Sequence, residues 1–185
     1  ADAHDFPSLA ARDVLAAPTL MPVKAVAGSI EAVASRAATT VPAPASVYAS
    51  TKLMQEDVMR QGLGQSGVEA GILRLQNVYG AGQSLHNPYT GVLSIFAQQL
   101  LDGKTLNIYE DGEIVRDFIY VSDVVMAFQR LCEIERVPDE TVDIGSGVGS
   151  TILNVAQTMI ATLGLEGERL AITGEFRPGD VRYAV

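Results

Sequence analysis

Helix-like and strand-like segments alternate from Ser46 to the end of the chain, and this alternation constrains the fold more than any other feature. Apolar residues recur at helical spacing in four segments, 46–61, 92–101, 122–135 and 151–163. Short apolar runs lie between them at 70–75, 106–109, 115–121, 142–144 and 170–173. Because strands that alternate with helices build layered sheets, the pattern predicts an α/β fold.

Turn and cap residues mark the ends of these segments. Ser46 is suited to cap the first helix, whose apolar face we expect to include Met54 and Val58. Thr151 is suited to begin the last helix. Asp111-Gly112 separates two β-rich runs, and Asp-Gly is typical of tight hairpin turns. We therefore expect the runs 106–109 and 115–121 to pair as a β-hairpin.

The first 45 residues differ from the rest, because they are rich in Ala, Pro, Ser and Thr. Prolines interrupt them at positions 7, 18, 22, 42 and 44, too often for long helices or strands. We expect residues 1–45 to form an irregular linker or insertion, with at most a short helical turn over 30–38.

Charge and composition exclude several classes of protein. The chain carries 13 Lys and Arg against 22 Asp and Glu, a net charge of −9, so nucleic acid and anionic membranes are disfavoured as partners. Its apolar runs fall short of the roughly 20 residues of a membrane span. Cys132, which we expect in the core, is the sole cysteine and indicates a reducing, cytoplasmic compartment. His4 and His86 lack further ligands at metal spacing, so we predict no metal site.

Tyr48 and Lys52 are four residues apart on the first predicted helix, so both side chains lie on one face. A tyrosine titrates near pH 10 and serves as a base at neutral pH only where a positive charge favours the phenolate. A lysine one turn away supplies that charge. The pair is common by chance, and its meaning depends on the surrounding sequence.

Four motifs follow one another in a familiar order: Ser-Val-Tyr-Ala-Ser-Thr-Lys at 46–52, Leu-Arg-Leu-Gln-Asn-Val-Tyr-Gly at 73–80, Arg-Asp-Phe-Ile-Tyr-Val at 116–121 and Arg-Pro-Gly-Asp at 177–180. Together they resemble the extended short-chain dehydrogenase/reductase family, and within it the nucleotide-sugar epimerases and dehydratases. The resemblance covers about residues 44–185. It implies the end of a Rossmann-like sheet over 46–80 and mainly a small α/β substrate-binding domain over 81–185.

The resemblance also implies roles for individual residues. Tyr48 would be the catalytic acid or base, and Lys52 would bind the nicotinamide ribose of NAD and lower the pKa of Tyr48. The residues that would hold the nucleotide-diphosphate sugar are Asn77, Tyr109 against the base, Arg116 and Arg177 on the diphosphate, and Asp180 on the ribose. Guanidinium groups suit that task because their planar donors match phosphate oxygens.

The implied reaction is NAD-dependent epimerisation of a nucleotide-diphosphate sugar at C4 through a 4-keto intermediate, in a homodimeric enzyme. A 4,6-dehydratase and a non-catalytic sugar-nucleotide binding module remain alternatives. The glycine turn Gly-x-x-Gly-x-x-Gly, on which the family binds the NAD pyrophosphate, is missing from the sequence. The loop Gly145-Ser-Gly-Val-Gly lacks a phosphate-binding lysine. We therefore expect the chain to be a fragment of a longer enzyme, inactive by itself.

Overall fold

A computed structural model describes residues 23–26, 29–32, 37, 39–85, 91–165, 167, 169–176 and 180–185. Helices and strands alternate as predicted, and the fold is α/β. The helices are α2 (Val47–Gly64), α3 (Val92–Leu101), α4 (Val121–Glu133) and α5 (Ile152–Thr162). The strands are β1 (Val23–Val26), β2 (Ser29–Ala32), β3 (Leu73–Leu75), β4 (Asn77–Tyr79), β5 (Leu106–Ile108), β6 (Val115–Tyr120), β7 (Val142–Ile144), β8 (Gly149–Thr151), β9 (Leu170–Ile172) and β10 (Tyr183–Ala184).

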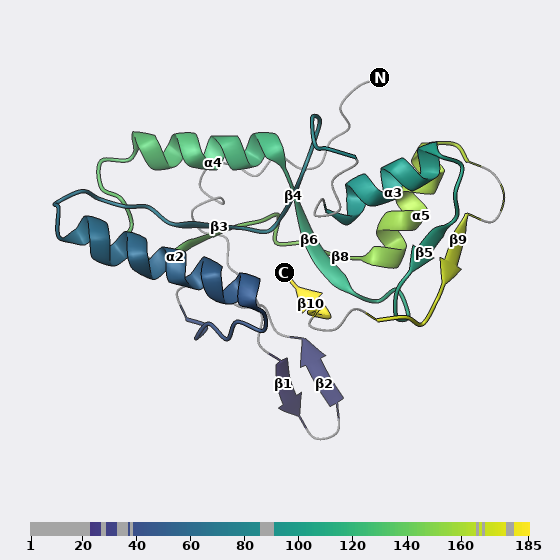
Figure 1. Cartoon of the computed structure of the whole chain (residues 1–185), viewed down its shortest axis with the longest axis horizontal. Helices are drawn as coiled ribbons and strands as arrows, with labels where there is room; N and C mark the ends of the chain where they lie inside the picture. The colour runs from purple at the N-terminus through teal and green to yellow at the C-terminus, as the bar shows by residue number, and fades with distance from the viewer. Residues whose placement is uncertain are drawn as a thin grey trace.

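At one end of the molecule, β3 pairs with β7 in parallel, and α2 and α4 lie on opposite sides of this pair (Figure 1). The buried side chains here come from β6, α4 and β7, namely Ile119, Val124, Ala127 and Ile144. α2 contributes no buried side chain, and its predicted apolar face is largely exposed, including Met54 and Val58. Polar contacts therefore contribute to holding α2 in place, beside the partly buried Leu53 and Leu63.

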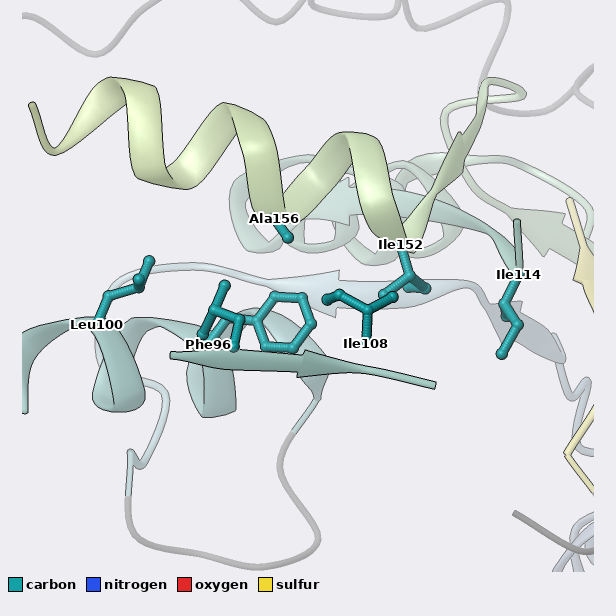
Figure 2. Close-up of a cluster of buried hydrophobic side chains, with 7 residues drawn as sticks. Phe96, Leu100, Ile108, Ile114, Ile152 and Ala156 are labelled. Carbon is teal, nitrogen blue, oxygen red and sulfur yellow. The ribbon is translucent and has the colours of Figure 1, made fainter. Parts of the chain in front are cut away.

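At the other end, β5 pairs in parallel with β9, and α3 and α5 pack beside them (Figure 1). Figure 2 shows Ala156 of α5 pointing toward Phe96 of α3 and Ile152 of α5 pointing toward Ile108 of β5, and Leu100 belongs to the same cluster. Thr151 caps α5 as predicted, because its hydroxyl accepts a hydrogen bond from the Asn154 amide at 3.1 Å. This cluster is the larger apolar core of the described residues.

β6 joins the two ends of the molecule. It pairs in parallel with β4 on one side and with β10 on the other, and its first residues also pair antiparallel with β8. Arg116 on β6 is opposite Ser150 of β8 and Ala184 of β10. The middle of the molecule is therefore built on one strand with neighbours from three distant parts of the chain.

The predicted hairpin of 106–109 with 115–121 is wrong. A tight turn is present, because the Gly112 amide donates to the Tyr109 carbonyl at 3.1 Å and Glu110 and Gly112 have φ angles of 52° and 84°. This turn leads the chain from one sheet into another, since β5 pairs with β9 and β6 with β4. Burial favours the pairing of β5 with β9, because Leu106 and Ile108 are fully buried in the α3–α5 core, against which Leu170 of β9 also packs.

Two smaller expectations also fail. Residues 29–32 form β2, which pairs antiparallel with β1, and the helical turn expected over 30–38 is not present in that part of it; residues 33–36 and 38 lie outside the described ranges. Strand pairing satisfies the backbone groups of both segments at once. Cys132 is exposed on α4, because the helix buries Val124 and Ala127 on another face.

We predict that Leu100→Ala lowers the free energy of unfolding by about 2–5 kcal/mol, because it removes a side chain that is 3% exposed and leaves a cavity between α3 and α5. Leu101→Ala is the matched control, because Leu101 is the next residue on the same helix and is 68% exposed. This substitution should change the free energy of unfolding by less than about 0.5 kcal/mol. Urea denaturation of both variants measures the difference. Equal losses would contradict the core described here.

Candidate active site

Ser46 fixes the start of the helix that carries Tyr48 and Lys52. Its hydroxyl accepts a hydrogen bond from the Ala49 amide at 3.1 Å, as predicted for a cap. The Lys52 ammonium lies 5.7 Å from the centroid of the Tyr48 ring and donates to Gln55 Oε1 at 3.2 Å. Tyr48 is 71% exposed. The four-residue spacing thus places a cation beside the phenol on a face that a ligand can reach.

Asn77 is the first residue of β4 and ties that strand to β6. Its side-chain amide donates to the backbone carbonyl of Asp117 at 2.9 Å. The side chain is partly buried, and its partner Asp117 is the residue that follows Arg116 on β6. Asn77 therefore belongs to the neighbourhood of Arg116, although the two come from different predicted motifs.

Arg116 and Asp180 form an ion pair across 64 residues of chain. Arg116 Nη2 lies 2.6 Å from Asp180 Oδ1, and Arg116 Nη1 donates to the Val115 carbonyl at 2.8 Å. The Arg116 side chain is 14% exposed and that of Asp180 36%. The structure thus brings together two of the residues expected to bind a sugar nucleotide.

Arg182 fastens the end of the chain to the turn that follows Tyr109. Its guanidinium contacts Glu110 and Asp111 at 2.5 Å each. The hydrogen bond from Arg182 lowers the pKa of Asp111, and the two carboxylates raise the pKa of Arg182. Tyr109 is half-exposed beside this turn. Sequence reasoning missed Arg182. The available indication was an arginine near the end of the chain together with two adjacent acidic residues in the turn.

Asp117 is the other residue that sequence reasoning missed. Its carboxylate is 1% exposed and accepts hydrogen bonds from the Ser146 amide and hydroxyl, at 2.9 and 2.5 Å, and from the Gly147 amide at 2.9 Å. A Cβ at Gly145 would collide with this carboxylate, so the close approach requires glycine. The Gly-Ser-Gly amides bind an internal carboxylate instead of a phosphate, and the loop leads into β8 and α5.

Charged contacts attach α2 to the sheet. Arg74 of β3 holds Glu56 of α2 with two hydrogen bonds, at 2.7 and 2.8 Å, and Thr141 donates to Glu56 at 3.2 Å. Burial alone would raise the pKa of Glu56, but hydrogen bonds and charge from Arg74, with help from Thr141 and Arg60, lower it overall. Burial raises the pKa of Asp143, whose Oδ2 accepts from the Ala37 amide at 2.6 Å.

The candidate site thus has two parts. Asn77, Tyr109, Arg116 and Asp180 are linked through β6, Arg182 and the turn at 109–112. Tyr48 and Lys52 make their hydrogen bonds within α2, and no hydrogen bond among the described residues joins them to the Arg116 group. In Figure 1 the N-terminal end of α2, which carries Tyr48, points toward the middle of the molecule. Arg177 lies outside the described residues.

Within the described ranges, no helix is long and apolar enough to cross a membrane. Across the same residues, no group of three or more His, Cys, Asp and Glu side chains could hold a metal ion. His4 and His86 lie outside these ranges.

Comparison with known proteins gives a consistent result. The profile of the NAD dependent epimerase/dehydratase family matches residues 24–145. A dTDP-L-rhamnose 4-epimerase from Burkholderia thailandensis is 43% identical over 152 residues, which are 81% of this chain and 41% of that protein. The chain therefore spans less than half the length of this relative.

Solved structures show the same fold. A UDP-glucose 4-epimerase from Thermotoga maritima, crystallised with UDP-glucose, matches with a TM-score of 0.71 and 32% identity over 80% of this chain and 46% of that one. A UDP-glucose 4-epimerase from Thermus thermophilus, in complex with NAD, matches with a TM-score of 0.65 and 32% identity over 78% of this chain and 46% of that one.

We predict that Asp117→Ala lowers the free energy of unfolding by about 1–3 kcal/mol, because three hydrogen bonds to a buried carboxylate are lost. Glu113→Ala, an exposed acidic residue on the same segment, should cost less than about 0.5 kcal/mol. Chemical denaturation distinguishes the two. An unchanged free energy of unfolding for Asp117→Ala would show that the carboxylate does not hold the loop.

Glu56 should make stability depend on acid pH. Since the pKa of Glu56 is lower in the folded state than in the unfolded chain, its contribution is complete above about pH 4.5 and is lost as the pH falls through the folded value. The raised pKa of Asp143 acts in the opposite direction, because protonation favours its folded form.

We therefore expect Glu56→Gln to flatten the fall in melting temperature below about pH 4.5 and Asp143→Asn to steepen it. At pH 7, Glu56→Gln should cost about 1.5–3 kcal/mol, the range for hydrogen bonds to a charged group. Asp57→Asn, an exposed neighbour on α2, serves as the control and should leave the profile unchanged. Parallel profiles for Glu56→Gln and the wild type would refute this assignment.

Proposed function

Because this chain belongs to the NAD-dependent epimerase/dehydratase family, we propose that it carries the proton-transfer pair and the sugar-nucleotide site of an enzyme that epimerises a nucleotide-diphosphate sugar at C4. Residues 46–80 would belong to the NAD-binding part and 81–185 mainly to the substrate-binding part. The observation that carries this proposal is the Lys52 ammonium beside the exposed Tyr48 ring. Relatives named as 4-epimerases support the choice of reaction.

Tyr48 would take the proton of the sugar 4-hydroxyl at its phenolic oxygen and return it later in the cycle. In this role Lys52 would supply a positive charge one helical turn from the phenolic oxygen. The rigid start of α2, capped by Ser46, keeps the two groups in register. NAD, when bound, supplies the hydride acceptor for C4.

The described residues fit one part of NAD. Tyr48 and Lys52 present an exposed hydroxyl and ammonium, which suit the nicotinamide ribose. A pyrophosphate needs a cradle of backbone amides, and those of Ser146 and Gly147 are already bound to Asp117. The pyrophosphate site would therefore come from a part of the parent protein other than this loop.

Arg116 would bind the diphosphate of the substrate, since its planar donors match phosphate oxygens and its backbone is fixed between β8 and β10. Asn77 would lie next to it, held to the neighbouring residue of β6. Tyr109 would pack against the base, Arg177 would add a second cation, and Asp180 would face the ribose.

The exposed apolar side chains of α2 also need a partner. Val47, Met54, Val58 and Met59 are exposed on this one helix. Contiguous exposed apolar surface marks an interaction site. We propose that α2 contributes to a homodimer contact in the parent enzyme, which the cysteine content would place in the cytoplasm. Sedimentation of the natural protein with and without Val58→Glu tests the contact, and an unchanged mass would reject it.

The first measurement is the intact mass of the protein from its native source. A mass near twice the 19.6 kDa of this chain supports a longer enzyme whose remaining part completes the NAD site. A mass near 19.6 kDa would favour the non-catalytic binding module instead.

We predict that Tyr48→Phe in the natural protein reduces turnover by about a hundredfold or more, because the proton acceptor is lost, while UDP or dTDP affinity changes by less than about twofold. Tyr183→Phe is the matched control and should retain turnover. Mass analysis of the product separates the reactions, since epimerisation conserves mass and a 4,6-dehydratase removes water. Continued sugar interconversion by Tyr48→Phe would refute the role.

A further inference from the structure

We propose that Asp180 is an internal counterion of Arg116, which a nucleotide diphosphate has to displace, so that Asp180 weakens binding of bare diphosphate and makes the site selective for the nucleoside part. This inference rests on the proposed function, in which Arg116 binds the diphosphate. Its basis is the 2.6 Å contact between Arg116 Nη2 and Asp180 Oδ1.

Asp180 is not needed to orient Arg116. The guanidinium already donates to the Val115 carbonyl at 2.8 Å, and its backbone is fixed opposite Ser150 and Ala184. The contact with Asp180 uses one nitrogen of Arg116 and one oxygen of Asp180, so it is not the two-pronged arrangement that locks an arginine in place. What Asp180 does supply is a negative charge next to the cation.

Contacts of the residues that follow Asp180 restrain its position, so the carboxylate stays near Arg116 when a ligand binds. The residues that follow it are tied to β6, because the Val115 amide donates to the Arg182 carbonyl and β10 continues the pairing. Arg182 is also bound to Glu110 and Asp111. Asp180 Oδ1 in turn accepts from the Val181 amide at 2.9 Å. The carboxylate therefore stays close to any diphosphate on Arg116, and like charges repel.

A nucleoside diphosphate can offset this repulsion and an inorganic diphosphate cannot. A ribose hydroxyl can donate to the displaced carboxylate, which then exchanges one partner for another. Inorganic pyrophosphate has no such donor and meets the full repulsion. Asp180 would thus set a difference in affinity between pyrophosphate and a nucleoside diphosphate such as UDP.

The test is calorimetric titration of the full 185-residue chain with inorganic pyrophosphate and with UDP. Asp180→Asn should bind pyrophosphate about three- to tenfold more tightly than the wild type and should gain less for UDP. The gain should shrink between 0.1 and 1 M NaCl, as the screening length falls from about 10 to about 3 Å.

Asp102→Asn is the matched control. Asp102 is 38% exposed against 36% for Asp180 and is likewise paired with a cation, Lys104, so the variant changes the net charge equally at a different place. It should leave both affinities unchanged. An equal gain for Asp102→Asn would overturn the proposal, because net charge alone would then explain it. Melting temperatures of all variants verify that each is folded.

Arg116→Ala separates the two levels of the argument. If it abolishes binding while Asp180→Asn binds pyrophosphate equally or more weakly than the wild type, Arg116 binds the diphosphate and Asp180 merely orients it, so only the inference fails. If Arg116→Ala leaves binding unchanged, or if the wild type and Asp180→Asn bind neither probe, the proposed diphosphate site fails and the inference fails with it.

Discussion

The hydrogen bonds of the buried Asp117 carboxylate are the interaction on which the middle of the molecule, around β6, depends. A carboxylate that is 1% exposed is costly unless it is fully hydrogen-bonded, and Ser146 and Gly147 supply the three donors. The backbone carbonyl of the same residue accepts from Asn77. One residue of β6 therefore fixes β4 and the loop between β7 and β8. Arg116, its neighbour along the strand, is fixed by its own pairing with Ser150 and Ala184 and by these contacts of Asp117.

The two ends of the molecule are stabilised in different ways. α3 and α5 bury apolar side chains against each other and against β5, and these side chains carry no group that titrates. α2 buries none and is attached through Glu56, Arg74 and Thr141. A charged attachment of this kind weakens on acidification. The helix that carries Tyr48 thus responds to conditions that leave the α3–α5 core unchanged.

The sequence predicted what is decided locally. The α/β class followed from periodicity, and Ser46 and Thr151 cap their helices as expected because a cap involves residues three apart. The hairpin failed because the turn at Asp111-Gly112 is local, whereas the partner of β5 lies more than 60 residues along the chain. Asp117 was missed because a single acid in an apolar strand carries no sign of the loop that binds it. The ion pair of Arg116 with Asp180 joins residues that the family resemblance had assigned separately, and their roles stay predictions.

The two parts of the candidate site are held in place by different structural contacts. Arg116, Asn77 and Asp180 are held by contacts within the chain, through β6, β10 and the loop after β7. Affinity for a sugar nucleotide can therefore be a property of these strands alone. Tyr48 and Lys52 lie on an exposed helix face, where water screens the charge of Lys52. In the proposed enzyme, proton transfer would gain from exclusion of water, because charge interactions strengthen as the local dielectric constant falls. Binding and turnover thus make separate demands on this chain, and whatever covers α2 would raise the second without altering the first.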